Sequence, residues 1–529
     1  MRSRYAGGAG SASAGCALST NGVVHAPDGG NSLLIGAWEP ARPFDPNVRV
    51  ALARCAATTV SAGTPVLAVS LSQPRVLRFA PGARSAALAL KTMLACVCVV
   101  LAWCAAADAA PLRAANPSLS LGPTSQYDLS KRVPLIVRVR LPRRGDFIVA
   151  ARVVERRAVR RLSPAFAVRG PGVRLVTLRI EPGISRHLGA CRRRGVEVVM
   201  HRRHGGVVAR TGRALASDPP RCGRFFGPET FWNRRLATST RIDRLSRTLV
   251  DDLRTQVEDG FAKRFPPTIN TTSYSAPVYN VPANQRRVPV ALVGERTAWG
   301  GKLQRTLAAG VPIPADARPA AGGDHHLVVW QPARDVMWEM WGAEYTNGRW
   351  ETQWGGRMNH VSRSPGYFYD PSGIQPGATA TSLPLVGGMI TQADLARHEI
   401  THALAMAIPS SRYAVWAKPA QRSDGGTRSD TAIPQGARFR LDPALDIDAM
   451  HLPRFTAMMA RAAQRYGIFV RDTSPTVTFY AQDPLTMGSD PWPKAITPSP
   501  PEVLRSFPWE HLQVVHMDLW SYSNEHIPH

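Results

Sequence analysis

The sequence predicts a mainly β protein with two β-sandwich-like domains: a small N-terminal sandwich and a larger, jelly-roll-like domain with a few helices. The chain has 529 residues, which is too long for one ordinary domain. Short runs in which apolar and polar residues alternate recur along it, separated by glycine and proline. This spacing is typical of antiparallel sandwiches. Helical spacing is sustained in few segments, so we expect helices to be the minority.

Residues 84–110 have the layout of a secretory signal peptide. Arg84 and Lys91 precede an uncharged apolar run that ends in the small residues 107–109. This run is shorter than the roughly 20 apolar residues that a membrane span needs. We therefore expect it to be cleaved, which would leave a secreted, extracellular protein with no stable membrane span. Residues 1–83 are rich in Gly, Ala, Ser and Pro without sustained periodicity, so they are either over-extended translation or disordered.

Residues 111–224 are expected to form the small β-sandwich module. The run 133–141 alternates apolar residues with two arginines, as a half-buried strand does. Similar runs follow at residues 146–154, 173–180 and 196–203. Cys191 and Cys222 are the only cysteines after the proposed cleavage, and an even pair in an exported chain predicts one disulfide.

The formal net charge of +27 comes mostly from arginine. A nucleic-acid binder or a protein of an anionic cell surface would both fit such a charge. The excess of Arg over Lys, with abundant Ala, Gly and Pro, is also what a GC-rich genome produces. Because the sequence contains no RNA- or DNA-binding motif, we do not expect nucleic acid as a partner.

Residues 225–500 are expected to form the main β-rich domain, and residues 501–529 a C-terminal tail. Two segments inside the main domain have helical spacing: residues 239–262, and residues 453–466, which end at Gly467. Strand-like runs make up most of the remainder: 287–293, 325–332, 335–341, 349–356, 436–443, 467–472 and 476–483.

Residues 398–402 match the H-E-x-x-H pattern of zinc metallopeptidases. In that class His398 and His402 would bind zinc and Glu399 would act as the general base. The two histidines can share one ion only on a helix, where residues four apart lie about 5–6 Å apart. On a strand the same residues lie roughly 13 Å apart. The secondary structure of this segment therefore decides whether it can bind zinc.

Both a helix and a strand fit the segment around this pattern. Thr391 followed by Asp394 is a capping-box pattern for a helix. Apolar residues at alternate positions from Ile400 to Ile408 instead indicate a strand. A third zinc ligand is not evident, because no glutamate follows before Glu502, although an aspartate or histidine could substitute for it: Asp424, Asp430, Asp448 or His451. Zinc is therefore expected only in this alternative, and otherwise no cofactor.

Polar residues that interrupt apolar strands form the site we predict instead. Asp324 and His326 precede one strand, Glu339 lies inside another, and His402 lies within the alternation of a third. A single buried polar residue more often has a structural role, since it needs only a hydrogen-bond partner. Together, carboxylates and imidazoles on neighbouring strands could supply acid and base catalysis of glycan hydrolysis or elimination. The sequence therefore predicts these four as candidate catalytic residues.

Two further residues are predicted to bind substrate. Trp338 belongs to a group of tryptophans close in sequence, whose flat faces could stack on sugar rings. The second is Arg422, for which the family resemblance given below, together with the charge of the side chain, implies binding of an anionic or hydroxyl-rich ligand. The expected partner is a polysaccharide or a cell-wall glycan.

A series of motifs occurs in order along residues 222–490: GGDHHLVVWQP, MWEMW, GATATSLPL, EITHALA, IPQGARFRLDP and AAQRYGI. This series resembles an uncharacterised family of secreted proteins from actinobacteria and related soil bacteria. The position that matches His398 is usually glycine in that family, whereas those matching Ile400 and His402 recur. The resemblance thus argues against zinc at His398.

Three functions of different class follow from the sequence. The first is a secreted glycan-binding or glycan-cleaving protein of the cell envelope. The second is a zinc metallopeptidase through residues 398–402, and the third is a non-catalytic structural surface protein.

Overall fold

The computed structural model describes residues 116–155, 158–185, 188, 194–215, 224–263, 265–369, 375–523 and 526–527, and the backbone of β1 (Ala53–Thr59) and β2 (Pro65–Leu71). The chain divides into two units, residues 1–112 and residues 113–529. In the first unit β1 and β2 pair antiparallel. The predicted signal peptide and the predicted Cys191–Cys222 disulfide lie outside the described residues.

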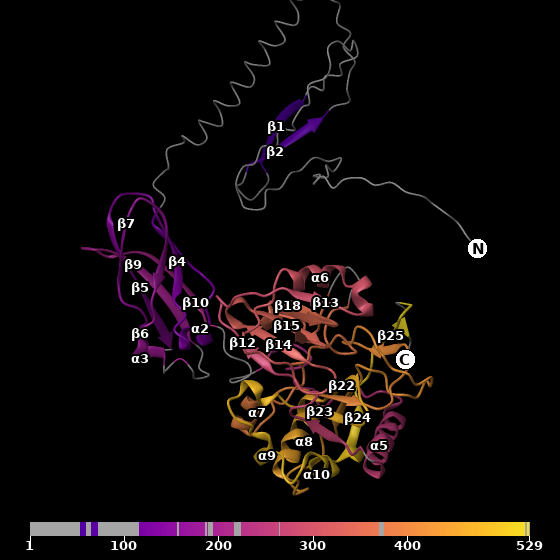
Figure 1. Ribbon diagram of the computed structural model, residues 1–529. Helices are drawn as coiled ribbons and strands as arrows, with labels where there is room; N and C mark the ends of the chain where they lie inside the picture. Colours follow the sequence, from indigo (N-terminus) through magenta and orange to yellow (C-terminus); the bar gives the residue numbers. More distant parts are fainter. Residues whose placement is uncertain are drawn as a thin grey trace, which may run out of the picture. The chain divides into compact units, whose positions relative to one another are not determined.

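The second unit is mainly β, with several antiparallel and mixed sheets, as the sequence predicts. Its first part contains two antiparallel sheets (Figure 1). One has the order β3 (Ser118–Leu121), β4 (Leu135–Leu141), β8 (Gly172–Leu178). The other contains β10 (Val207–Ala214), β9 (Gly195–Arg202), β5 (Asp146–Glu155) and β6 (Ala158–Arg161), with β7 (Phe166–Arg169) also paired to β5. Two short helices accompany them: α2 (Gln126–Ser130) and α3 (Pro182–Ser185).

Alternation along β4 explains how this part is held together. Leu135, Val137, Val139 and Leu141 are buried, and the residues between them are exposed. Their side chains join those of the second sheet in one hydrophobic core. Residues 116–215 thus have a core of their own, and we refer to them below as the N-terminal module.

The described part of residues 224–527 forms four sheets. A six-stranded sheet has the order β11 (Thr268–Asn270), β23 (Thr478–Tyr480), β19 (Leu404–Ile408), β22 (Ile468–Thr473), β21 (Arg438–Leu441), β24 (Leu512–Val514). A four-stranded sheet has the order β12 (Val278–Asn280), β14 (Leu327–Gln331), β15 (Val336–Trp341), β18 (Trp354–Asn359). The two small sheets are β13 (Val290–Leu292), β17 (Arg349–Thr352), β16 (Glu344–Thr346), and β20 (Val415–Ala417), β25 (Leu519–Ser521), β26 (His526–Ile527).

Parallel pairs occur in three of these sheets: β11 with β23, β19 with β22, β12 with β14, and β13 with β17. A jelly roll is built from antiparallel strands. The arrangement therefore departs from the jelly-roll-like detail of the prediction, although its mainly β character agrees.

The two larger sheets each bury both faces. One face of the six-stranded sheet, with Met406 of β19, packs on helices α5 (Ser246–Ala262), α8 (Arg454–Tyr466) and α10 (Pro500–Arg505). Its other face, with Ala405, shares a core with Met337 of the four-stranded sheet. The far face of the four-stranded sheet, with Trp338, packs on α6 (Gly301–Ala308). Figure 1 shows the resulting order: α6, the four-stranded sheet, the six-stranded sheet, then α5, α8 and α10.

The two helices predicted in this region are confirmed as α5 and α8. Gly467 ends α8 in the left-handed region, with φ of 82°, where a residue without Cβ is unstrained. The remaining short helices are α7 (Gln392–Arg397), α9 (Trp492–Ala495) and the 3-10 helices η1 (Glu295–Trp299), η2 (Pro332–Arg334), η3 (Val361–Arg363), η4 (Pro484–Thr486) and η5 (Trp509–His511). Within the described part of the chain, no helix has the length and apolar character that crossing a membrane requires.

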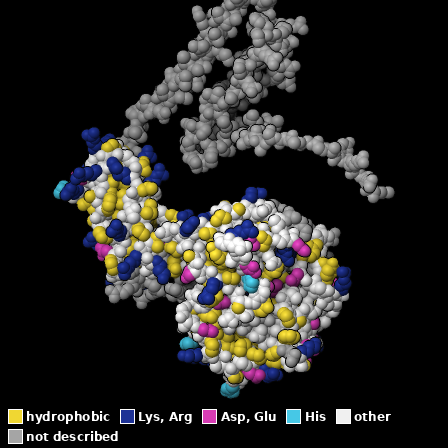
Figure 2. Space-filling model, viewed as in Figure 1, with side chains coloured by type: hydrophobic (Ala, Val, Ile, Leu, Met, Phe, Trp, Pro, Cys, Tyr) yellow, Lys and Arg dark blue, Asp and Glu magenta, His cyan; other side chains and the backbone are white. Residues whose placement is uncertain are grey.

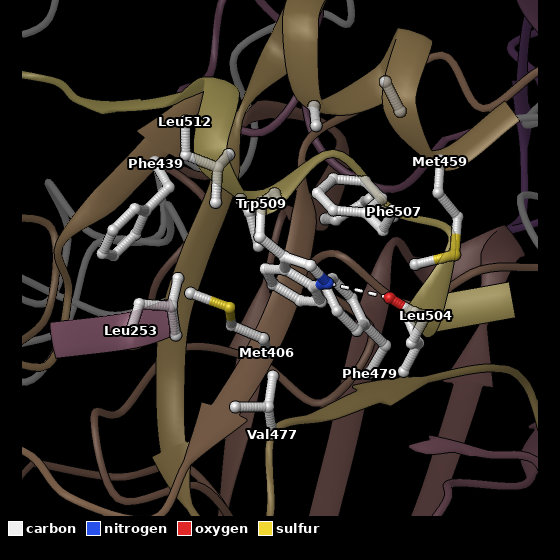
Figure 3. Packing of buried hydrophobic residues seen from close by; sticks show 14 of the residues in the cluster. Leu253, Met406, Phe439, Met459, Val477, Phe479, Leu504, Phe507, Trp509 and Leu512 are labelled. Atoms are coloured by element: carbon white, nitrogen blue, oxygen red, sulfur yellow. Dashed lines mark hydrogen bonds between the residues drawn. The ribbon is translucent and has the colours of Figure 1, made fainter. Parts of the chain in front are cut away.

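The C-terminal residues belong to the core of this region, which corrects the predicted boundary at residue 501. Strand β24 pairs with β21, and Leu504, Phe507 and Trp509 are buried. Figure 3 shows Trp509 between Met406 of the sheet and Phe507, its indole N–H donating to the Leu504 carbonyl over 2.8 Å. Short apolar stretches without clear periodicity gave no sign of this packing, because it depends on partners far away in the sequence.

Candidate active site

Residues 398–402 run from the end of a helix into a loop and do not form a helical turn. Helix α7 ends at Arg397, and His398 is its C-cap, exposed and left-handed with φ of 57°. The next strand begins at Leu404. Glu399 forms an ion pair with Arg465, with 2.8 Å between the carboxylate and the guanidinium. Because the zinc pattern needs both histidines on one helix, the segment lacks that geometry.

His402 forms a buried pair with Asp394. Its Nε2 lies 3.2 Å from the Asp394 carboxylate, and its Nδ1 lies 2.8 Å from the Ala403 carbonyl. Burial acts to lower the pKa of His402, but the charge and hydrogen bond of Asp394 outweigh it and raise that pKa above its ordinary value. The same contact lowers the pKa of Asp394, although burial acts to raise it. The two groups are therefore an ion pair.

The start of helix α7 holds Asp394 in place. Thr391 donates to this carboxylate through its amide (2.8 Å) and its hydroxyl (2.6 Å), which confirms the predicted capping box. Arg397 adds a third donor at 2.7 Å. His402 also lines a small cavity with Phe226 and Trp232, which has room for about one water.

These contacts correct the predicted position of His402. We expected it to lie near His326 and Glu339, but its polar partners are Asp394 and the Ala403 carbonyl. It therefore belongs to a separate, structural pair.

The His398→Gly variant is expected to fold and to be more stable than the wild type by up to about 1 kcal/mol, because glycine has no Cβ to strain the left-handed C-cap. Chemical denaturation of both proteins measures this difference. Zinc measured on the purified proteins provides the control: stoichiometric zinc in the wild type that is lost in this variant would contradict our account of residues 398–402.

Glu339 lies on β15 and points into the core between the two larger sheets. It is fully buried, and its two carboxylate oxygens accept the amides of Ala378 (2.7 Å) and Leu385 (2.8 Å). Burial raises its pKa to about 7, against the lowering effect of these amides and of the Arg471 and Arg422 charges. Both oxygens are thus used in holding the 378–385 loop, so Glu339 positions this loop and does not face a substrate.

Trp338, the neighbour of Glu339, points to the opposite face of the sheet. Its ring is fully buried, with the guanidinium groups of Arg287 and Arg357 at 5.3 and 5.4 Å from its centre. No face of the ring is free for a sugar, which corrects the substrate-binding role predicted for it. Trp341 is only partly buried, and its indole N–H donates to Asp324 over 3.0 Å. Trp341 is therefore the tryptophan that the structure brings to the candidate site.

Asp324 and His326 lie together before β14, as expected. Asp324 has 41% of its side chain exposed, and its carboxylate is 4.0 Å from Nε2 of the buried His326. Nδ1 of His326 lies 3.1 Å from the Ser275 carbonyl. Burial lowers the pKa of His326 to about 4; Asp324 opposes this shift and Arg471 adds to it. The imidazole is therefore neutral at pH 7.

Arg471 and Asp472 on β22 complete this group, and neither is among the site residues predicted from the sequence. The pairing of β22 with β19 shifts register at Arg471, since Met406 lies opposite Val470 and Ala407 opposite Asp472. Such an irregularity redirects side chains. Arg471 is buried over the Tyr480 ring, 4.1 Å from its centre.

The guanidinium of Arg471 is held by backbone carbonyls and by the Tyr480 side chain. Nη1 donates to the carbonyls of Leu385 (2.7 Å) and Gly387 (3.0 Å). Its Nε has no hydrogen-bond partner among the described residues. A buried cation therefore lies at the centre of the group with one donor unused.

Asp472 has a pKa near neutral pH, which suits a general acid. Burial and the nearby Asp424 carboxylate raise its pKa to about 7, and the Arg471 charge opposes the shift. The Ala380 amide approaches one of its oxygens at 3.4 Å. Asp424 is exposed and accepts from Gln435 (2.6 Å) and from the Thr473 hydroxyl (2.7 Å). A carboxylic acid thus lies beside a fixed carboxylate.

Arg422 lies next to these carboxylates, but its hydrogen bonds go to the protein. It donates to the carbonyls of four loop residues: Gln375, Gly377, Thr379 and Ala380. Burial and the Arg296 charge lower its pKa to about 10, while Asp472 and Asp424 act to raise it. The predicted substrate-binding role is therefore replaced by a positioning role, because Arg422 fixes the loop that approaches Asp472.

The structure thus brings Asp324, His326 and Asp472 together with Asp424, and leaves Glu339 and Arg422 as supports behind them. Among the described residues, no three His, Cys, Asp or Glu side chains are placed to hold one metal ion. Compared with models of known protein families, the chain matches none, and it matches no curated protein. The family resemblance stated above therefore stays a prediction.

Proposed function

We propose that this chain is an extracellular, carbohydrate-active protein that binds and cleaves a glycan at the Asp472–Asp424 site. The observation that carries the proposal is a carboxylic acid with a pKa of about 7 beside a second carboxylate. Hydrolysis of a glycosidic bond uses such a pair, one group protonating the leaving oxygen and the other acting as base or nucleophile. In this proposal Asp472 is the acid and Asp424 its partner.

The surroundings of the pair support a sugar as the ligand. Trp341 is partly exposed, with the Arg296 guanidinium 5.1 Å from its ring centre, and Asp324 can accept hydrogen bonds from hydroxyl groups. The loop that Glu339 and Arg422 hold supplies backbone groups beside Asp472. Secretion is the remaining part of the proposal, and it rests on the layout of residues 84–110.

A polysaccharide screen tests this function. The full chain would be incubated with neutral and acidic plant polysaccharides and with peptidoglycan, and both retention on the insoluble polymers and release of reducing ends would be measured. We expect release from at least one polymer. Retention without release would leave a binding protein and contradict the cleavage step, and peptide-bond hydrolysis with stoichiometric zinc would favour the metallopeptidase instead.

A further inference from the structure

The positive charge of the chain is concentrated in the N-terminal module. Residues 116–215 contain 22 Lys and Arg but only 5 Asp and Glu, a net charge of +17 out of +27 for the whole chain. Figure 2 shows Lys and Arg side chains distributed over the visible face of this module, with hydrophobic side chains between them. A general bias toward arginine does not explain this distribution, because the same genome encodes residues 216–529, whose net charge is only +4.

The outer face of the β3–β4–β8 sheet combines arginine with exposed aliphatic residues. Arg138 lies opposite Leu175, and Arg140 opposite Val173, so these four side chains share one face. Leu175 is 73% exposed and Val173 51%. Ile136, on the same face of β4, is 45% exposed. None of the residues of these three strands is acidic.

We propose that this β3–β4–β8 face docks on an anionic lipid bilayer. Arg138 and Arg140 would pair with lipid phosphates, and Leu175, Val173 and Ile136 would enter the apolar region below the headgroups. Charge complementarity favours an anionic surface, because each basic side chain near such a surface raises the affinity about fivefold. The aliphatic residues favour a lipid bilayer over other anionic surfaces, because a nucleic acid or a polysaccharide in water offers them no apolar environment. Aromatic side chains, which stack on bases and sugars, are absent from these three strands.

Vesicle sedimentation with the full chain tests this proposal. Vesicles of phosphatidylcholine alone are compared with an equimolar mixture of phosphatidylcholine and phosphatidylglycerol at low salt. We expect binding to the anionic vesicles only. The Arg138→Gln/Arg140→Gln double variant should weaken it about 30-fold, and Leu175→Asn about tenfold.

Matched controls on strand β6 of the same module separate this face from the charge of the module as a whole. Val159, which is 55% exposed, and its exposed neighbour Arg160 are replaced by Asn and Gln. Neither change should alter vesicle binding, and glycan cleavage should be unaffected by all of these variants. Equal losses in the control variants would overturn the proposal. Binding to soluble polyphosphate or polyuronate that competes with vesicles and is insensitive to Leu175→Asn would also overturn it, in favour of a general polyanion site.

Discussion

Replacing Asp472 by asparagine is expected to reduce glycan cleavage at least about a hundredfold, the lower end of what a positioned general acid contributes. Asparagine keeps the shape of the side chain but has no proton to give to a leaving oxygen. Release of reducing ends by the Asp472→Asn variant measures the loss. Exposed Asp448, whose partner is Arg461, gives the control variant Asp448→Asn, which should retain full activity.

The same variant should be more stable than the wild type at pH 8. The pKa of Asp472 is about 7 in the folded protein, whereas a free aspartate has about 3.8, so the folded state binds more protons between these values. Stability therefore falls as the pH rises from about 4 to about 7, and the cost persists above pH 7. Because asparagine does not titrate, the unfolding free energy of the variant should fall less than that of the wild type over this pH range.

Urea denaturation of both proteins at pH 5 and pH 8 measures this difference. A lower activity with a higher stability is the signature of a residue placed for chemistry. An Asp472→Asn protein that cleaves normally would contradict the proposed role. A variant that loses stability and activity together would instead mark Asp472 as structural.

The Asp394→Asn variant is expected to lose about 3–5 kcal/mol of unfolding free energy, the usual cost of breaking a buried ion pair by removing one charge. His402 would remain buried without its carboxylate, and the asparagine amide would offer one acceptor oxygen in place of the two that now accept from Thr391 and Arg397. The lowered pKa of Asp394 means that its contribution is present above about pH 3.8 and disappears as the pH falls through its folded pKa. The raised pKa of His402 means that its contribution is complete below about pH 6.5 and is lost as the pH rises through its folded pKa. The full effect should therefore appear near pH 5 to 6.

A double-mutant cycle with His402→Gln separates the pair from the cap. We expect the Asp394→Asn/His402→Gln protein to lose less unfolding free energy than the two single variants lose together, because neither charge is then buried without its partner. Additive losses would show that the two residues act independently. Because His402 lies with Asp394 and not with Asp472, His402→Gln should change stability without changing cleavage per folded molecule.

Local patterns predicted the elements of this protein well. Alternation predicted the strands β4, β5 and β9, short strand-like runs predicted β14, β15 and β22, and helical spacing predicted α5 and α8. The capping box at Thr391 was also visible, since it depends on residues three apart. These features are set within a few residues, so the sequence alone contains them.

The sequence could also have separated Glu339 from Trp338. Successive residues of a strand point to opposite faces, so these neighbours could not both face one site. Our prediction placed both residues in one site because it considered their residue types and not the alternation of side chains along the strand. For residues 398–402 both periods fitted. In the structure they connect α7, which ends at Arg397, to β19, which begins at Leu404.

The candidate site was decided by tertiary structure. Asp472 and Asp424 are single carboxylates 48 positions apart, and no local period connects them. They lie together because Asp424 accepts a hydrogen bond from the hydroxyl of Thr473, the neighbour of Asp472 on β22. Burial beside a second carboxylate then raises the pKa of Asp472 to about 7. The sequence by itself determined which segments become strands and which faces are apolar, whereas strand order, register and the resulting burial decided which side chains meet, because those depend on contacts between residues far apart in the chain.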